Sequence, residues 1–383
     1  MRYKPLRVVW EITWKCNLKC MHCGSDCISV EKSEQLTTAE CLDIVADLKS
    51  LGTELITLSG GEPLLRKDFA TIAAAIKSQG MDVAFISNGL AINDENVKLL
   101  QAINPIVYGL SMDSADEWMH DYIRGHKGCF EHLLAAINLL QEHGIKVGIV
   151  TTVHRLNFTQ LPKIRDLLLT MGVDAWQIQY ADFIGRMPHD TMITEAQYWE
   201  MAKFILDIKQ NYSARLYVTG SDSTGYMSDF SKQLQGNWYG CHAGIKVLGI
   251  GSDGTLRGCL SQQMDKFIEG NVRERSLVDI WNDPNKFEYN RHFDCSMLTG
   301  YCKECLYGPI CKGGCVIAST NLGDCRCNPY CLYKIEKEGY SSEEQARLDF
   351  SKEEIAAQYN QVRELPPEFY EDFNEHWDCC FRG

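Results

Sequence analysis

Runs of apolar residues alternate with amphipathic segments through the first half of the chain. The apolar, β-rich runs predict six strands, at Arg7–Thr13, Glu54–Ser59, Asp82–Ser87, Ile106–Ser111, Lys146–Val153 and Ala175–Tyr180. Segments with apolar residues at helical spacing predict helices at Thr38–Leu51, Lys67–Gln79, Asp94–Ala102, Cys129–His143, Thr159–Met171 and Thr194–Gln210. Such alternation predicts an α/β fold with a parallel sheet and right-handed crossovers, of the partial (β/α)6 TIM-type barrel class.

The second half has a different pattern. Residues 212–332 are rich in Gly, Cys and short apolar runs, and a hairpin is predicted at Lys246–Arg257. A charged helical run, Glu353–Arg363, follows near the end. We therefore expect three parts: a barrel at 1–211, a cysteine-rich domain at 212–340 and a helical tail at 341–383.

Charge and cysteine content narrow the classes of function. A formal net charge of −13 argues against a dedicated nucleic-acid binder, which needs a basic face. No apolar run reaches the roughly 18 residues that span a bilayer, and the first residues do not form a signal peptide. The chain has 18 cysteines but no export signal, so we expect a cytoplasmic protein whose thiols are metal ligands or catalytic groups.

The first cysteine group, Cys16-x3-Cys20-x2-Cys23, directly follows the first predicted strand. Three thiolates on one short loop suit a cubane iron–sulfur cluster and leave one of its four irons without a protein ligand. An open metal position allows a substrate or cofactor to bind the metal directly. The alternative is a structural zinc site with His22 or Cys27 as its fourth ligand.

Four further motifs follow predicted strands or lie just beyond them. They are Ser59-Gly60-Gly61-Glu62-Pro63, Ser87-Asn88-Gly89, Ser111-Met112-Asp113 and Ile123-Arg124-Gly125. Together with the cysteine loop, they make the sequence resemble the radical S-adenosylmethionine (SAM) enzymes. The resemblance implies that the open iron chelates SAM. It also implies that one electron cleaves SAM to methionine and a 5′-deoxyadenosyl radical, which abstracts hydrogen from a substrate.

The resemblance also implies that these motifs surround SAM. Gly60 and Gly61 lack side chains, so backbone can approach the methionyl amine closely, and Glu62 offers that amine an acceptor. The other implied contacts are to the ribose from Ser111 and Asp113, to ribose or carboxylate from Ser87 and Asn88, to the carboxylate from Arg124, and to the adenine from His22. A satisfied surface histidine is the alternative for His22.

The second cysteine set, residues 241–331, resembles the SPASM extension of a radical SAM subfamily, which holds two auxiliary [4Fe–4S] clusters. The implied ligands are Cys302, Cys305, Cys311 and Cys331 for an outer cluster, and Cys241, Cys259 and Cys315 for an inner cluster nearer the barrel. The inner cluster then either keeps an open iron or takes a ligand from Cys295, Cys325, Cys327, Cys379 or Cys380. Zinc ribbons are the alternative here, and Cys27, Cys41 and Cys129 are interpreted as ordinary thiols.

The subfamily implies a peptide or protein substrate, modified by a crosslink, a thioether or dehydrogenation. A reductant such as flavodoxin or ferredoxin is implied as well. Because the first strand begins near Arg7, we expect any leader peptide to need a separate binding protein or a groove on the barrel. Leu260 stands where sulfatase-maturing members carry Asp, so formylglycine formation is not expected. Asp182, His154 and Tyr180 lie near strand ends and are the candidates for a catalytic base, although each has a structural alternative.

Two other functions remain open at this point. The first keeps the radical chemistry and changes the substrate to a tetrapyrrole, such as a haem precursor, or to another small metabolite. Related enzymes for haem precursors usually have fewer cysteines in the C-terminal region. The second is a non-catalytic iron–sulfur or zinc-binding protein, which would form no 5′-deoxyadenosine from SAM.

Overall fold

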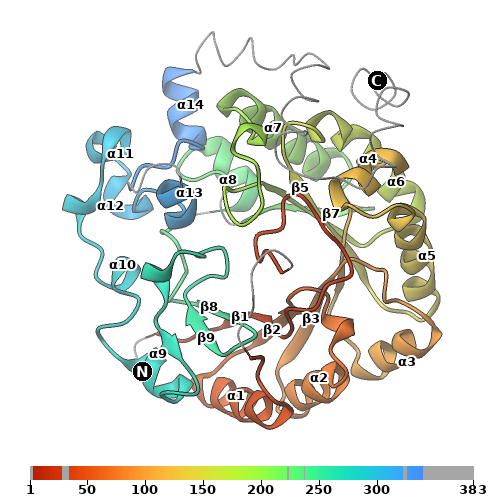
Figure 1. Cartoon of the computed structure of the whole chain (residues 1–383). Coiled ribbons are helices and arrows are strands. Elements are labelled where there is room, and N and C mark those ends of the chain that lie inside the picture. Colours follow the sequence, from red (N-terminus) through yellow and green to blue (C-terminus); the bar gives the residue numbers. More distant parts are fainter. Residues whose placement is uncertain (1–2, 28–33, 222–223, 237, 322–325, 340–383) are drawn as a thin grey trace.

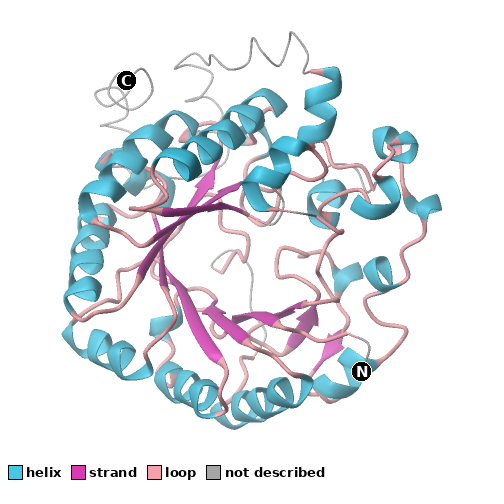
Figure 2. Ribbon diagram, turned by 180° about the vertical axis from the view of Figure 1, so that it is seen from behind, coloured by secondary structure: helices cyan, strands magenta, loops and turns pink. Residues whose placement is uncertain are grey.

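One ten-stranded sheet organises the chain, as the computed structural model shows (Figure 1). The structure describes residues 3–27, 34–221, 224–236, 238–321 and 326–339. The strands lie in the order β10 (Gly270–Asn271), β9 (Thr255–Arg257), β8 (Val247–Ile250), β1 (Arg7–Glu11), β2 (Leu55–Ser59), β3 (Asp82–Ser87), β4 (Tyr108–Ser111), β5 (Val147–Val153), β6 (Ala175–Tyr180) and β7 (Tyr217–Gly220). The strands form an arc inside a ring of helices (Figure 2).

Strands β1 to β7 pair in parallel with their neighbours in chain order. The helices that connect them are α1 (Thr38–Leu51), α2 (Phe69–Ser78), α3 (Asp94–Ile103), α5 (Cys129–Glu142), α6 (Leu161–Met171) and α7 (Glu195–Asn211). The partial barrel predicted from the sequence is thus confirmed, and β7 extends it by one strand. The carboxyl ends of parallel strands gather at one end of such a barrel, where ligands bind.

Helix α4 (Glu117–Arg124) was not predicted. Every residue from Trp118 to Arg124 is buried, including the charged Asp121 and Arg124. A helix with ionic side chains on its buried side has no clean apolar stripe, which is the signal that sequence patterns provide. Asp116 caps its first turn by accepting a hydrogen bond from the backbone N–H of Met119 at 2.9 Å.

The cysteine-rich region is joined to the barrel through the sheet. The predicted hairpin is confirmed as β8 and β9, which pair antiparallel, and β8 pairs in parallel with β1. The short helix α8 (Asp229–Gln235) precedes the hairpin. Further short helices follow it, at α9 (Leu277–Asn282), α10 (Glu288–Arg291), α11 (Gly300–Glu304), α12 (Gly308–Cys311), α13 (Val316–Asn321) and α14 (Leu332–Glu338). The predicted helical run Glu353–Arg363 lies outside the described residues, as do Cys325, Cys379 and Cys380.

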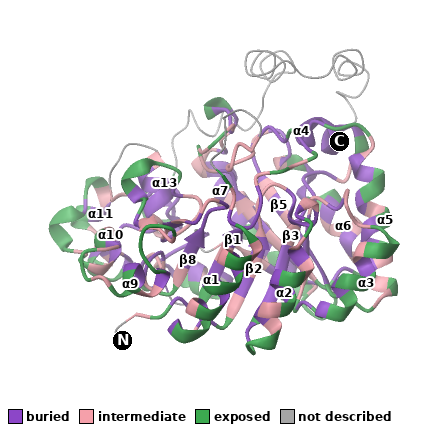
Figure 3. Cartoon of the chain, turned by 60° about the horizontal axis from the view of Figure 1, so that its bottom comes forward, coloured by how far each residue is buried: buried purple, intermediate pink, exposed green. Residues whose placement is uncertain are grey.

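The core lies between the strands and the helix ring. Figure 3 shows buried residues along the strands and exposed residues on the outer faces of the helices. Trp10 and Trp176 are fully buried on β1 and β6, and the rings of Phe85 and Tyr108 stack at 5.4 Å between β3 and β4. In the part of the chain that the structure describes, no helix is both long enough and apolar enough to cross a bilayer.

Candidate active site

The cysteine loop leaves β1 and is held from two sides. The backbone N–H of Met21 donates to the carbonyl of Ile123 at 3.0 Å, which ties the loop to the end of α4. The N–H of Arg186, in the loop after β6, donates to the carbonyl of Cys23 at 3.0 Å. The Arg124 guanidinium lies 3.7 Å from the sulfur of Cys20. These contacts fix the three thiols at the mouth of the barrel.

The chemistry of these thiols suits an iron–sulfur cluster. Burial raises the pKa of the Cys16 thiol to about 12, and the neighbouring Cys20 and Cys23 thiols contribute to that rise. Buried thiolates packed this closely need a positively charged partner, which the irons of a cluster supply. Among the residues described, no group of three or more His, Cys, Asp or Glu side chains is arranged to hold a single metal ion.

The glycine pair after β2 is needed for close packing against this loop. A Cβ atom on Gly61 would lie 2.1 Å from the carbonyl oxygen of Lys15. One on Gly60, where φ is +141°, would lie 2.5 Å from that of Thr13. The next residue, Glu62, donates its backbone N–H to the Lys15 carbonyl at 2.7 Å. The glycines therefore bring the Glu62 carboxylate beside the start of the cysteine loop. Their implied approach to SAM stays a prediction.

Glu62 is fully buried and is held by the motif after β3. It accepts hydrogen bonds from the Ser87 hydroxyl at 2.9 Å and from the Asn88 backbone N–H at 2.8 Å. Burial raises the pKa of Glu62 to about 7, although the Asn88 and Ser87 donors oppose the rise. The carboxylate thus lies in a low-dielectric site where a bound ammonium or amine would be a strong partner.

This raised pKa predicts how SAM affinity depends on pH. Below pH 7 the Glu62 carboxyl gains a proton and loses its attraction for the methionyl amine, so the Kd for SAM should rise about tenfold per pH unit. Isothermal titration between pH 8 and pH 6 measures this. The Glu62→Gln variant has no titrating group at this position. The difference in pH dependence of the Kd between wild type and this variant therefore gives the contribution of Glu62, separate from protonation of SAM itself. Equal pH slopes for the two proteins would contradict the assignment.

A buried ionic triad lies next to the cysteine loop. One oxygen of Asp113 contacts both the His22 Nε2 and a terminal nitrogen of Arg124 at 2.7 Å. The other accepts from the backbone N–H of Thr152 at 3.1 Å. Burial alone would raise the pKa of Asp113, but Arg124 and His22 outweigh it and hold that pKa well below its usual range. The structure therefore pairs Asp113 with Arg124. The implied contacts of these residues with the ribose and carboxylate stay predictions.

The three candidate bases occupy different environments. His154 is completely buried after β5, 6.0 Å from the His22 ring, and both of its ring nitrogens lack a hydrogen-bond partner among the described residues. Burial lowers the pKa of His154 to about 3, so its ring is neutral. The Tyr180 ring packs against Tyr330 at 4.7 Å in the core. Burial raises the pKa of Asp182 to about 7.

Asp182 faces the second cysteine set. Its charge acts on the thiols of Cys259 and Cys315, which also interact with each other and with Cys241. The structure thus gathers the three thiols assigned to the inner cluster and brings the end of β6 close to them. Their role as ligands stays a prediction.

The thiols assigned to the outer cluster also lie together. Cys302, Cys305, Cys311 and Cys331 interact with one another electrostatically. Cys327 joins them, because its sulfur accepts hydrogen bonds from the Cys302 thiol and from the backbone N–H of Tyr301. The sequence analysis gave Cys327 as one candidate for the missing ligand of the inner cluster. The structure places it in the outer group.

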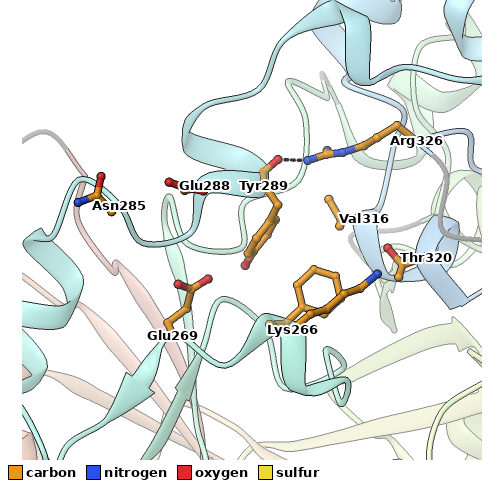
Figure 4. A pocket seen from close by; sticks show the side chains of 9 residues that line it. Lys266, Glu269, Asn285, Glu288, Tyr289, Val316, Thr320 and Arg326 are labelled. Carbon is orange, nitrogen blue, oxygen red and sulfur yellow. Dashed lines mark hydrogen bonds between the residues drawn. The ribbon is translucent and has the colours of Figure 1, made fainter.

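A cavity that the sequence did not reveal lies beside the inner group. Its volume is about 460 Å³, and Lys266, Glu269, Tyr289 and Arg326 are among the residues that line it (Figure 4). The Tyr289 hydroxyl donates to the Gln262 side-chain oxygen at 2.9 Å, and the same oxygen accepts from the backbone N–H of Cys259 at 3.1 Å. The cavity wall is thus two hydrogen bonds away from an inner thiol.

Comparison with known proteins decides the family. Residues 10–168 match the radical SAM superfamily, and residues 241–306 match the SPASM iron–sulfur cluster-binding domain. The chain belongs to the radical SAM superfamily. It is a radical SAM enzyme with a C-terminal SPASM domain, and its cofactors are SAM, a [4Fe–4S] cluster and auxiliary clusters. The non-catalytic alternative is therefore wrong.

Named relatives of this radical SAM enzyme include two from Methanosarcina barkeri. The AdoMet-dependent heme synthase is 28% identical over 350 residues, which cover 87% of this chain and 98% of the relative. The Fe-coproporphyrin III synthase is 30% identical over 299 residues, which cover 73% of this chain and 74% of the relative. The structure of Streptococcus suis SuiB bound to S-adenosylmethionine has a TM-score of 0.70 at 20% identity, covering 85% of this chain and 76% of that one. This last likeness concerns the fold alone.

Proposed function

We propose that this radical SAM enzyme abstracts hydrogen from a tetrapyrrole that carries carboxylate side chains. The observation that carries the proposal is the 28% identity to a heme synthase over nearly the full length of both chains. This choice reverses the order expected from the sequence, which placed a peptide substrate first. We include three [4Fe–4S] clusters in the proposal, one bound by the N-terminal loop and two bound by the SPASM domain.

A cationic group beside the cysteine loop supports an anionic substrate. Arg186 follows β6, and its backbone contacts Cys23. Its side chain reaches Asp26 at 3.3 Å, yet one terminal guanidinium nitrogen is buried and has no hydrogen-bond partner among the described residues. Guanidinium groups bind carboxylates in a planar, two-point geometry. Arg186 is therefore placed to receive a substrate carboxylate near the position of the radical.

The chain's own residues would hold and shield the reactants. Glu62 would offer its buried carboxylate to the methionyl amine, and the Asp113–Arg124 pair would hold the cysteine loop through the contact of Arg124 with Cys20. When bound, SAM and the reduced cluster supply the 5′-deoxyadenosyl radical that takes a hydrogen atom from the substrate. Because these side chains are buried, they exclude water from the radical.

A peptide substrate is the second candidate, and the SPASM thiols favour it. The outer group holds five thiols, those of Cys302, Cys305, Cys311, Cys327 and Cys331, and so is well supplied for a second auxiliary cluster. Enzymes for haem precursors usually have fewer cysteines in this region. SuiB, which shares the fold, has been solved bound to its precursor peptide SuiA.

An anaerobic assay separates the two substrate classes. The reconstituted enzyme, SAM and dithionite are mixed with Fe-coproporphyrin III or with a short peptide encoded beside the enzyme. 5′-Deoxyadenosine and substrate mass are then followed. We expect tetrapyrrole-dependent 5′-deoxyadenosine and a lower tetrapyrrole mass. We expect Arg186→Gln to raise KM at least tenfold, whereas Arg275→Gln, which changes an exposed arginine, has no effect. A mass change in the peptide alone would overturn the first candidate and support the second.

A further inference from the structure

The radical chemistry leaves the cavity beside the inner group without a role. Its volume of about 460 Å³ lies in the range of small-molecule sites, roughly 300 to 1,000 Å³. Its walls come from the turn before β10, from α10, from α13 and from the segment after α13 (Figure 4). Lys266 and Glu288 are among the lining residues and contribute one charge of each sign. The cavity is therefore built by the SPASM region and is strongly polar.

Glu269 brings a buried negative charge to this cavity. The residue is only 7% exposed, and its side chain lines the wall. Burial raises the pKa of Glu269, although the backbone N–H of Phe287 opposes the rise. Lys286 and Arg291 act on it only from a distance, and no cation among the described residues forms an ion pair with it. Carboxylates are rarely buried without a partner, so Glu269 lacks the cation that such a site normally holds.

Arg326 brings a positive charge that has no counter-ion either. Its guanidinium donates to the backbone carbonyls of Tyr289 and Lys312. It also lies 3.4 Å from the side-chain oxygen of Asn290, but no carboxylate in the described part of the chain pairs with it. Carbonyl and amide oxygens satisfy its donors without balancing its charge. Figure 4 shows Glu269 and Arg326 on different sides of the Tyr289 ring, so the two charges do not neutralise each other.

Two unpaired charges of opposite sign on one cavity suit a ligand that carries both. An ammonium at Glu269 would gain a charge-assisted hydrogen bond, and a carboxylate at Arg326 would meet the planar guanidinium. Phe267 and Val316 leave an apolar part of the wall for a hydrophobic side chain. We propose that this cavity binds a small zwitterion of the α-amino acid class. The proposal goes beyond the tetrapyrrole reaction and does not depend on it.

Isothermal titration of the reconstituted holoenzyme with each of the common L-amino acids tests the proposal. SAM is present at saturation and no reductant is added, so the SAM site is filled and SAM is not cleaved. We expect at least one amino acid to bind with a Kd below about 1 mM. Its N-acetyl derivative and its amide each lack one of the two charges, and each should bind about tenfold more weakly.

Glu269→Gln removes the carboxylate charge with little change of shape. We expect it to raise the Kd of the free amino acid about tenfold, because the ammonium loses its charged partner. It should not raise the Kd of the N-acetyl derivative, which has no ammonium to lose. Glu274→Gln is the matched control, since it removes an exposed carboxylate that does not line the cavity, and it should leave both Kd values unchanged.

Each contrary result would overturn the proposal in a different way. If no amino acid binds to the wild-type holoenzyme, the cavity is not a site of this class. If the N-acetyl derivative binds as tightly as the free amino acid, the ammonium is not recognised. If Glu269→Gln weakens both ligands equally, the residue only shapes the wall. Because no tetrapyrrole is present, failure of the tetrapyrrole proposal in its own assay leaves this result unaffected.

Discussion

Cys20→Ala is expected to reduce 5′-deoxyadenosine formation to the level of uncatalysed SAM breakdown. Cys20 is 8% exposed and packs with Leu18 and Cys129. We expect its sulfur to be one of three cluster ligands, and alanine has no atom that can bind iron in its place. Loss of one of three thiolate ligands leaves the cluster with two. Anaerobic reconstitution followed by iron analysis and chromatography of 5′-deoxyadenosine measures the effect.

The matched control removes a buried thiol from a different place. Cys41 lies in α1 within the barrel core, away from the loop, and Cys41→Ala should keep most of the activity. The auxiliary clusters should remain in Cys20→Ala, so its iron content should fall by about one cluster rather than to zero. Substantial 5′-deoxyadenosine from this variant would refute the assignment of the N-terminal loop.

The second large effect concerns stability. Asp113→Asn is expected to lower the free energy of unfolding by about 3–5 kcal/mol, because it leaves the buried Arg124 charge without its carboxylate. Denaturant unfolding, read by circular dichroism, measures this change. Asp116→Asn, at the N-cap of α4, is the control, since Asn caps helices about as well as Asp and should cost little.

The pH dependence of this loss has a definite sign. The pKa of Asp113 is depressed in the folded protein, so the triad contributes stability above the ordinary aspartate pKa of about 4 and loses it as pH falls below that value. The difference between wild type and Asp113→Asn should therefore be full at pH 7 and shrink in acid. A loss below about 1 kcal/mol at pH 7 would mean that the ion pair is not formed in solution.

The barrel was predictable because its signals are local. The buried parallel strands are mostly apolar runs, and most of the chemical motifs follow a strand end, so order along the chain gives position in space. The site as a whole was less predictable. Motif spacing did not predict that Arg124 pairs with Asp113, because spacing alone does not show which charged groups meet. The expected contact of Arg124 with the SAM carboxylate stays a prediction.

Contacts between distant segments account for the other differences. Cys327 lies among the outer thiols because Arg326 is held against the backbone carbonyls of Tyr289 and Lys312, far away in sequence. The substrate class could not be predicted from the sequence for a similar reason. The recognised motifs are those expected to surround SAM, whereas residues that contact the substrate are expected in loops without a shared pattern.

The parallel pairing of β8 with β1 has a mechanical consequence. β1 leads into the N-terminal cysteine loop, and β8 leads through its hairpin to Cys259. The Ser252 hydroxyl, in the hairpin, donates a hydrogen bond to the Glu11 carbonyl at the end of β1 at 2.8 Å and so joins the two segments. Clusters bound by these two segments, as we predict, would be attached to neighbouring, hydrogen-bonded strands of one sheet. Backbone geometry would then set the distance over which an electron tunnels between them.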